Sequence, residues 1–200
     1  MTDRTRLRRD LRRARRALDP LYRTEASLAI ARQLVSGLLT RRYMRIAGYV
    51  ASDAEADPGP FLAAARLRGR RIYLPMLAPL QPARLRFGLA KAGQALAVNR
   101  FGIPEPVATP TVAPTFLDLA LVPLVGFDDR GNRLGMGAAY YDRTFAFLRM
   151  RRLFRKPRLV GVAFDCQRTA QIDSAPWDVP LDGVVTESGL WWFNSHEEHA

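Results

Sequence analysis

Apolar residues near the start of the chain recur with the period of an α-helix. Spacings of four, three and four place one apolar stripe along residues 4–18, which predicts an amphipathic helix. The stripe consists of Leu7, Leu11, Ala14 and Leu18. Asp19 and Pro20 are expected to end this helix, and a second amphipathic helix is predicted over residues 24–39. The arginines between the apolar positions are expected to cover the solvent side.

Short apolar runs alternate with helical segments through the rest of the chain. Strands are predicted at residues 46–50, 71–75, 84–89, 119–124, 159–164 and 183–187. Further helices are predicted from Pro60 to Gly69 and at about residues 138–150, whereas the proline-rich stretch 101–114 is expected to be an ordered loop. Because strands that alternate with helices form sheets covered on both faces, this order predicts an α/β layered fold with a largely parallel sheet.

Length and composition favour one folded unit. The chain has 200 residues, of which 48% are hydrophobic, and we expect a single domain over residues 1–193 with a tail at residues 194–200. The N-terminus has no apolar segment typical of a secretory signal. The longest apolar run, residues 119–127, is much shorter than the roughly 18 residues of a membrane span. With Cys166 as its single cysteine, the sequence favours a protein of the reducing cytoplasm.

An excess of arginine gives the chain a formal charge of +12. Residues 1–45 alone hold 13 arginines against four acidic residues. Such a charge attracts anions, including nucleic acid, phosphorylated metabolites and polyglutamate tails, and does not distinguish between them. Arg4 and Arg8 lie one helical turn apart, so they could reach a polyphosphate together, form part of a solvated basic face or belong to an RNA-binding arm.

The stretch GNRLGMGAAYYDR, residues 131–143, follows a predicted strand and precedes a predicted helix, where open α/β sheets bind ligands. Gly135 and Gly137 allow backbone N–H groups to approach an anion closely. Arg133 can bind phosphate, and Asp142 can hold Mg²⁺. The alternative is a glycine-rich connection with a surface arginine and a surface aspartate. The stretch lacks the third glycine of the dinucleotide fingerprint, and the chain has no GxxxxGK(S/T) phosphate loop.

Acidic residues in two other loops give weaker signals. Asp53, Glu55 and Asp57 could recognise a cationic or hydrogen-bond-donating substrate, such as an amino-pterin ring, or could form a turn. Asp178 and Asp182 could bind a metal ion or cap turns. Because both histidines lie among the last five residues, a Ser-His-Asp or Cys-His arrangement is disfavoured and no zinc site is expected.

Four stretches, in this order, resemble the 5-formyltetrahydrofolate cyclo-ligase family, also called 5,10-methenyltetrahydrofolate synthetase. They are RLRRDLRRARRAL, FGIPEP, LALVPLVGFDDRGNRLGMGAAYYDR and PWDVPLDGVVTE. The resemblance covers nearly the whole chain, and the third stretch is its most specific part. It implies a three-layer, single-domain α/β fold of the NagB/RpiA/CoA-transferase type, with a central mixed, mostly parallel sheet flanked by helices.

The resemblance also implies a reaction that uses ATP and Mg²⁺. The substrate is 5-formyltetrahydrofolate, with or without a polyglutamate tail, and the products are 5,10-methenyltetrahydrofolate, ADP and phosphate. The formyl oxygen takes the γ-phosphoryl group, the 10-nitrogen attacks the activated carbon and phosphate leaves, so no covalent enzyme nucleophile is needed. A monomer that acts on this small molecule, without a membrane or nucleic-acid partner, is expected. The alternative is a nucleic-acid-binding or other anion-binding protein on the same scaffold without cyclo-ligase activity.

Matched residue by residue, the resemblance implies three sets of ligand-binding residues. The ATP site would consist of Arg4, Arg8, Arg133, Leu134, Gly135, Met136, Gly137, Ala138, Ala139, Tyr140 and Tyr141. The substrate site would consist of Val50, Glu55, Phe101, Met136 and Tyr140. The Mg²⁺ ligands would be Asp142 and Asp178, while Arg133 and Tyr140 would position the reactants.

Three positions depart from the usual pattern of the family. Arg4 stands where the family usually has lysine, which keeps the charge and changes the geometry toward phosphate. Ala138 and Ala139 replace a segment that usually contains glycine, and a Cβ at Ala139 restricts positive φ. Pro58 stands where threonine is common.

Overall fold

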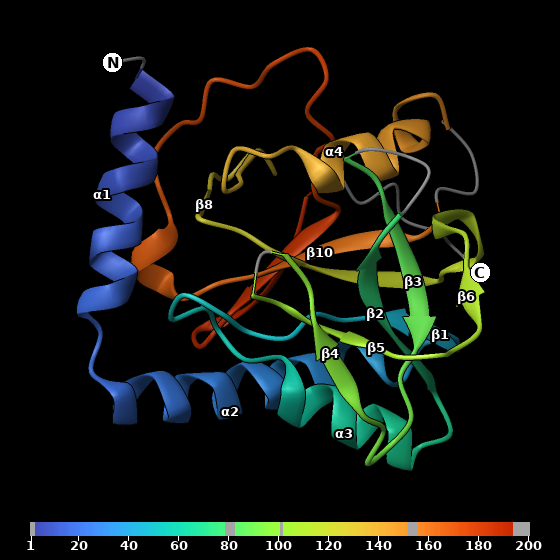
Figure 1. Cartoon of the computed structure of the whole chain (residues 1–200). Helices are drawn as coiled ribbons and strands as arrows, with labels where there is room; N and C mark the ends of the chain where they lie inside the picture. Colours follow the sequence, from blue (N-terminus) through green and yellow to red (C-terminus); the bar gives the residue numbers. More distant parts are fainter. Residues whose placement is uncertain (1–2, 79–82, 101, 152–155, 194–200) are drawn as a thin grey trace.

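The computed structural model describes residues 3–78, 83–100, 102–151 and 156–193. Its centre is an eight-stranded sheet with helices on both faces (Figure 1). In spatial order the strands are β12 (Gly189–Trp192), β11 (Gly183–Thr186), β10 (Arg158–Val162), β7 (Leu119–Pro123), β1 (Arg45–Ala47), β2 (Arg71–Leu77), β3 (Leu85–Leu89) and β6 (Thr111–Val112). The strands from β11 to β2 are parallel, and β12, β3 and β6 are antiparallel to their neighbours. The predicted α/β fold with a mixed, mostly parallel sheet is confirmed.

The first two helices form where the apolar periodicity predicts them. They are α1 (Asp3–Ala17) and α2 (Pro20–Leu38), and α3 (Gly59–Leu67) follows β1. α2 begins at Pro20 rather than at residue 24, because the Asp19 side chain accepts hydrogen bonds from the backbone N–H groups of Leu21 and Tyr22 at 2.8 and 3.2 Å. Such a cap, followed by proline at the first helical position, stabilises a helix start.

The helix predicted over residues 138–150 is divided into two parts. α4 spans Tyr140–Phe145, and a 3-10 helix, η2, spans Ala146–Arg149. The start is later than predicted because Gly137 and Ala139 both have positive φ, which a right-handed helix does not allow.

The prediction of a loop over residues 101–114 is wrong in two places. β5 (Pro104–Pro106) pairs with β4 (Leu96–Val98), and β6 pairs with β3. The two prolines of β5 are tolerated because β5 is an edge strand of a two-stranded sheet, where a missing N–H group removes no essential ladder bond. The other short elements are η1 (Pro114–Phe116), β8 (Gly126–Phe127), β9 (Arg133–Leu134) and η3 (Asp165–Gln167).

The sheet buries a hydrophobic core on each face. On one face, Ile30 of α2 and Phe61 of α3 share a core with Ile46 of β1. On the other face, Phe145 of α4 shares a core with Val122 of β7. Figure 1 shows the resulting layers, with α2 and α3 on one side of the sheet and α4 on the other.

α1 covers the carboxyl edge of the parallel strands. β1, β7 and β10 are parallel, so the loops that follow them meet at this edge. α1 packs against η3, and Leu11 of α1 shares a small core with Val125, Leu134 and Ile172. Gly126 permits this approach, since a Cβ there would lie 2.3 Å from a methyl group of Leu11. The arginines of α1 are thereby brought to the edge where such sheets bind ligands.

Candidate functional site

The loop between β9 and α4 has a buried base and an exposed tip. Arg133 is buried, whereas Met136 at the tip is 51% exposed. Gly137 and Ala139 have φ values of +107° and +51°, so the chain turns sharply before α4 begins. Because the tip is exposed, a ligand can reach the backbone groups of the loop just before α4 begins.

Arg133 joins the base of this loop to two other segments. Its guanidinium donates hydrogen bonds to the Val179 carbonyl and to Asp142 Oδ1. The Val179 N–H donates to the same carboxylate oxygen at 3.1 Å. Burial lowers the pKa of Arg133, and the negative charges of Asp142 and Asp178 oppose this effect. The two aspartates, 36 positions apart in the sequence, therefore lie around one guanidinium.

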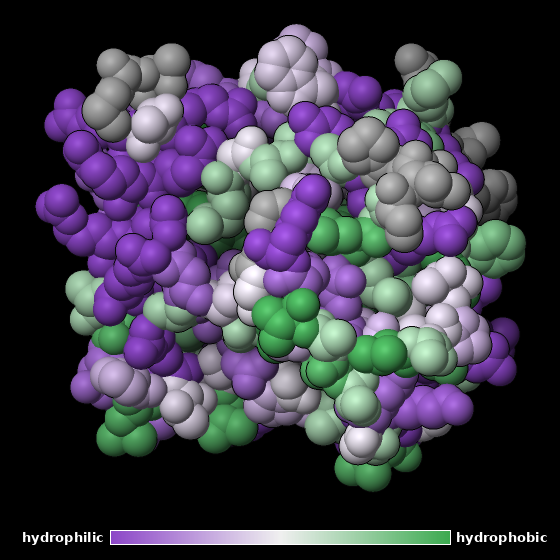
Figure 2. Space-filling view, viewed as in Figure 1, coloured by the Kyte–Doolittle hydropathy of each residue, from purple (hydrophilic) through white to green (hydrophobic). Residues whose placement is uncertain are grey.

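α1 reaches the same place from the other side. Arg4 donates to Asp178 Oδ2 at 2.9 Å, and Arg8 donates to the Gly135 carbonyl at 2.8 Å. The structure thus brings Arg4 and Arg8 to the loop between β9 and α4. The spacing in the sequence alone did not decide between this position and a solvated basic face. The outer side of α1 carries other arginines in solvent, and Figure 2 shows a hydrophilic surface over this helix.

Asp142 and Asp178 form a suitable half-site for Mg²⁺. This ion prefers oxygen ligands and is commonly held by one or two carboxylates together with substrate phosphates. The Asp142 carboxylate is bonded to the residue after Asp178, which keeps the two acids close. Within the described part of the chain, no three acidic, histidine or cysteine side chains gather into a complete metal site. The residues present therefore fit a metal ion that arrives with phosphate oxygens.

Asp182, the other acidic candidate for a metal, has a structural role instead. It is buried, and it accepts a hydrogen bond from the Leu159 N–H at 2.7 Å and one from Arg158 at 3.2 Å. These bonds fasten the start of β10 to the segment before β11, so Asp182 ties two strands together.

Glu55 lies in the loop after β1, near the start of α4. Its carboxylate accepts hydrogen bonds from the Ser52 N–H at 3.0 Å and the Ser52 hydroxyl at 3.3 Å. Burial raises the pKa of Glu55. Burial and the charge of Glu55 also raise the pKa of Tyr141. The two predicted site residues come from distant segments, and Glu55 is near enough to Tyr141 for its charge to act on the hydroxyl.

Val50 lines a cavity of about 230 Å³ beside the same loop. The cavity lies between the loop after β1, α3 and β2, and its lining includes Asp57, Leu62, Arg66 and Ile72. Most of this lining is apolar, with one carboxylate and one guanidinium. Such a composition suits a planar ring with polar edges.

Tyr140 connects the start of α4 to the β4–β5 hairpin. Arg100 in the hairpin turn donates a hydrogen bond to the Tyr140 hydroxyl at 3.1 Å. The sequence did not indicate Arg100, since the hairpin has no periodic signal. The neighbouring candidate Phe101 lies outside the described residues.

The expectation that the arginines of α1 cover its solvent side is wrong for Arg15. This side chain is fully buried and is bonded to Asp53 and to the Leu124 carbonyl. Its position, four residues after Leu11 in the apolar stripe, is the signal that could have identified it.

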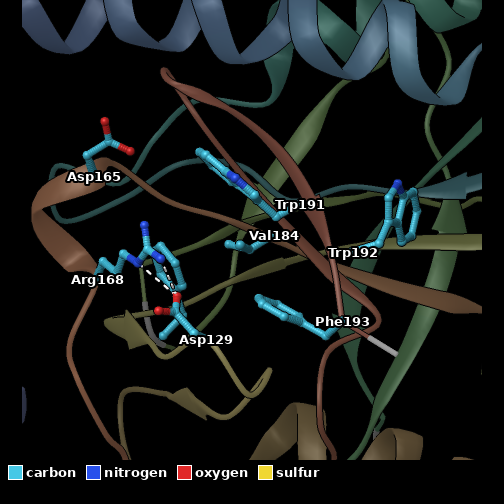
Figure 3. A pocket seen from close by; sticks show the side chains of 8 residues that line it. Asp129, Asp165, Arg168, Val184, Trp191, Trp192 and Phe193 are labelled. Atoms are coloured by element: carbon cyan, nitrogen blue, oxygen red, sulfur yellow. Dashed lines mark hydrogen bonds and ion pairs between the residues drawn. The ribbon is translucent and has the colours of Figure 1, made fainter. Parts of the chain in front are cut away.

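A second cavity, of about 220 Å³, lies apart from these residues. Figure 3 shows Trp191, Trp192 and Phe193 around it, with Arg168 paired to Asp129. No residue of the loop between β9 and α4 is among the described residues that line it. We therefore place the candidate site at the carboxyl edge and not in this aromatic cavity.

The left-handed conformation of Ala139 predicts a stabilising substitution. Ala139→Gly should raise the free energy of unfolding by about 0.5–1 kcal/mol, because glycine relieves the strain of positive φ and loses part of that gain to its freer unfolded state. Ala138→Gly is the matched control and should lower stability, because Ala138 is not among the residues with positive φ. Urea denaturation of both variants measures the change in the free energy of unfolding. Equal shifts of the two midpoints would contradict the left-handed conformation of Ala139.

The fold is that of an α/β protein, and the cluster of arginines and carboxylates at the carboxyl edge of its sheet is the candidate ligand-binding site. The model of the 5-formyltetrahydrofolate cyclo-ligase family matches residues 1–187. The chain belongs to this family.

Individual relatives agree with the family assignment. A 5-formyltetrahydrofolate cyclo-ligase from Escherichia coli K12 is 34% identical over 183 residues, which cover 90% of this chain and 98% of the relative. One from Haemophilus influenzae is 31% identical, with 91% and 96% covered. The NMR structure of Aquifex aeolicus 5,10-methenyltetrahydrofolate synthetase has a TM-score of 0.79 and 29% identity, with both chains fully covered. The predicted family is confirmed, and with it a ligase of folate one-carbon metabolism that uses ATP.

Proposed function

We propose that this protein converts 5-formyltetrahydrofolate to 5,10-methenyltetrahydrofolate, with ATP hydrolysed to ADP and phosphate, and that the reaction requires Mg²⁺. The observation that carries the proposal is the convergence of α1, the loop between β9 and α4, and the segment around Asp178. In this proposal the arginines would bind a triphosphate, and the carboxylates beside them would hold a cation. A metal-bound nucleoside triphosphate fits both groups, because its phosphates bind arginines and its metal ion binds carboxylates.

The ATP site in this proposal consists of residues 133–141 together with Arg4 and Arg8. Burial and the neighbouring charges of Arg4 and Arg12 lower the pKa of Arg8. A polyphosphate beside these guanidinium groups reduces their mutual repulsion, which favours its binding. Arg4 would exchange the Asp178 carboxylate for phosphate, and its bidentate geometry suits that partner.

Asp142 and Asp178 would hold the Mg²⁺ ion. When bound, the ion neutralises phosphate charge and helps to align the triphosphate for transfer. Arg133 keeps Asp142 in place through its bonds to the carboxylate and to Val179. The release of Asp178 from Arg4 would make its carboxylate available to the ion.

The folate side of the site would consist of Val50, Glu55, Met136 and Tyr140, and we include Phe101 on the family resemblance. Glu55 would accept hydrogen bonds from N–H groups of the pterin. Its surroundings suit this role, because the Glu55 side chain is only 11% exposed and a largely buried carboxylate bonds such donors more strongly than a solvated one. Met136, at the exposed tip of the loop, would contact folate and nucleotide together.

Catalysis in this proposal comes from positioning and charge stabilisation. The formyl oxygen of the substrate takes the γ-phosphoryl group and ADP leaves. The 10-nitrogen then attacks the activated carbon, the ring closes and phosphate departs with the formyl oxygen. Arg133 and Tyr140 would orient the reactants, and no covalent bond to the protein forms.

We also propose that the protein acts in the cytoplasm as a monomeric unit over residues 1–193, on a folate that can carry a polyglutamate tail. Among the described helices, none combines the length and the hydrophobicity that a membrane crossing requires. The predicted tail, residues 194–200, lies outside the described residues.

The proposal is tested by mixing the protein with ATP, Mg²⁺ and 5-formyltetrahydrofolate and following the near-ultraviolet absorbance of 5,10-methenyltetrahydrofolate. An increase that depends on ATP supports it. RNA binding that weakens steeply with salt, without any folate turnover, would instead favour the nucleic-acid alternative, which the charge of +12 motivates.

A further inference from the structure

Three arginines of α1 converge on one carboxylate in the loop after β1. Arg12 and Arg15 donate to Asp53 Oδ2 at 3.0 and 2.9 Å, and Arg16 donates to Asp53 Oδ1 at 2.5 Å. Burial favours a higher pKa for Asp53, but the hydrogen bonds from Arg16 and Arg12 hold it below its ordinary value. Asp53 is therefore a charged anchor for this part of α1.

Arg15 differs from the other two arginines in its burial and in its reach. Its side chain is 1% exposed, whereas Arg12 and Arg16 are 30% and 56% exposed. It donates to the Asp53 carbonyl at 2.8 Å and to the Leu124 carbonyl at 3.2 Å. A buried guanidinium is costly unless it is paired and hydrogen-bonded, and the segments around Asp53 and Leu124 supply those partners. Arg15 fixes the backbone of Asp53 as well as its side chain.

That backbone is strained. The Glu55 N–H donates to the Ser52 carbonyl at 2.9 Å, which closes a four-residue turn. The two central residues, Asp53 and Ala54, have φ values of +50° and +60°. Alanine disfavours this conformation, which persists only when surrounding contacts hold it. The bonds from α1 to Asp53 are among the contacts that hold this turn.

The turn ends at Glu55, the acid of the proposed folate site. Ser52, the first residue of the turn, bonds the Glu55 carboxylate through its N–H and its hydroxyl. Arg15 Nη1 also lies 4.0 Å from Glu55 Oε1. The direction of this carboxylate therefore depends on the closed turn.

We propose that Arg15 and Asp53 form a clamp that holds the turn of residues 52–55 closed and thereby positions Glu55 toward the folate. This inference rests on the proposed function. Arg15 and Asp53 are positioning residues, because they act on the substrate only through Glu55.

The test separates positioning from simple attachment of α1. Dissociation constants for 5-formyltetrahydrofolate and for Mg-ATP are measured by calorimetry on the full chain, for the wild type, Asp53→Ala and the double variant Asp53→Ala/Ala54→Gly. Asp53→Ala should weaken folate binding about tenfold, the factor expected when about 1.4 kcal/mol of backbone strain is no longer held. Mg-ATP binding should change much less. Ala54→Gly should restore part of the folate affinity, because glycine at position 54 adopts positive φ without strain while alanine at position 53 stays strained.

Arg13→Ala, at an exposed arginine of the same helix, is the matched control and should bind both ligands as the wild type does. If Asp53→Ala is too unstable, Asp53→Asn removes the charge and keeps a residue that tolerates positive φ, and its folate affinity should fall by a smaller factor.

Equal losses for folate and Mg-ATP, with no recovery on adding Ala54→Gly, would show that Asp53 only attaches α1 and would overturn the clamp. Folate affinity unchanged in every variant would overturn it too. A wild type that fails to bind folate would reject the proposed function itself, and the clamp with it.

Discussion

Replacing Asp142 with asparagine is expected to lower kcat/KM for 5-formyltetrahydrofolate at least about a hundredfold. Residues that merely support a metal ligand typically account for 10- to 100-fold, so the loss of a ligand should reach or exceed the top of that range. The concentration of Mg²⁺ that gives the half-maximal rate should rise as well. Asparagine keeps the size of the side chain and can still accept the Val179 N–H bond, so the change is mainly in charge.

Asp129→Asn is the matched control for this experiment. Asp129 also pairs with an arginine, Arg168, at 2.7 Å, but both side chains are more than half exposed, and Asp129 lines the aromatic cavity that no described residue of the loop between β9 and α4 lines. Its removal should leave the rate and the Mg²⁺ requirement unchanged. Normal turnover of Asp142→Asn at an unchanged Mg²⁺ requirement would show that Asp142 does not hold the metal.

Replacing Arg133 with methionine is expected to lower the free energy of unfolding by about 3 kcal/mol or more. The Arg133 side chain is 4% exposed and its partner Asp142 is 18% exposed, so the substitution leaves a largely buried carboxylate without its cation. Removing one partner of a buried ion pair typically costs about 3–5 kcal/mol. The Val179 carbonyl loses its donor in the same substitution. Methionine retains most of the apolar stem, which limits the effect of a cavity.

The denaturant midpoint of this variant, measured with its slope, gives the stability change directly. Arg168→Met is the control, since the Arg168–Asp129 pair is exposed and exposed pairs contribute little to stability. A variant at position 133 as stable as the control would contradict the assigned role of Arg133 at the base of the loop.

The sequence predicts the long elements well because each carries its own periodic signal. α1 contains the apolar stripe from Leu7 to Ala14 and ends one residue before Leu18, and β7 and β10 overlap the apolar runs predicted at residues 119–124 and 159–164. The short strands have no such signal: β5 reads Pro-Glu-Pro, and it exists because β4 lies beside it. Similarly, α4 begins late because of the local backbone at Ala139, which composition alone does not reveal.

The candidate site is predictable only in part for a related reason. Two glycines between a strand and a helix indicate an anion-binding loop from the sequence. The contact of Arg4 with Asp178 joins residues 174 positions apart, and spacing alone cannot give it. For that pairing, only the family resemblance places both residues in one site. Arg15 is the opposite case, because its position four residues after Leu11 indicates burial while its charge argues against it.

The most direct test of the central claim is the turnover assay on the wild-type protein. Near-ultraviolet absorbance of 5,10-methenyltetrahydrofolate and release of ADP are followed together, in the complete mixture and in mixtures that lack ATP, Mg²⁺ or protein. We expect both products to form at equal rates in the complete mixture and not when ATP, Mg²⁺ or protein is omitted. The account would be contradicted if the absorbance did not increase at high protein concentration, or if 5,10-methenyltetrahydrofolate formed without ATP.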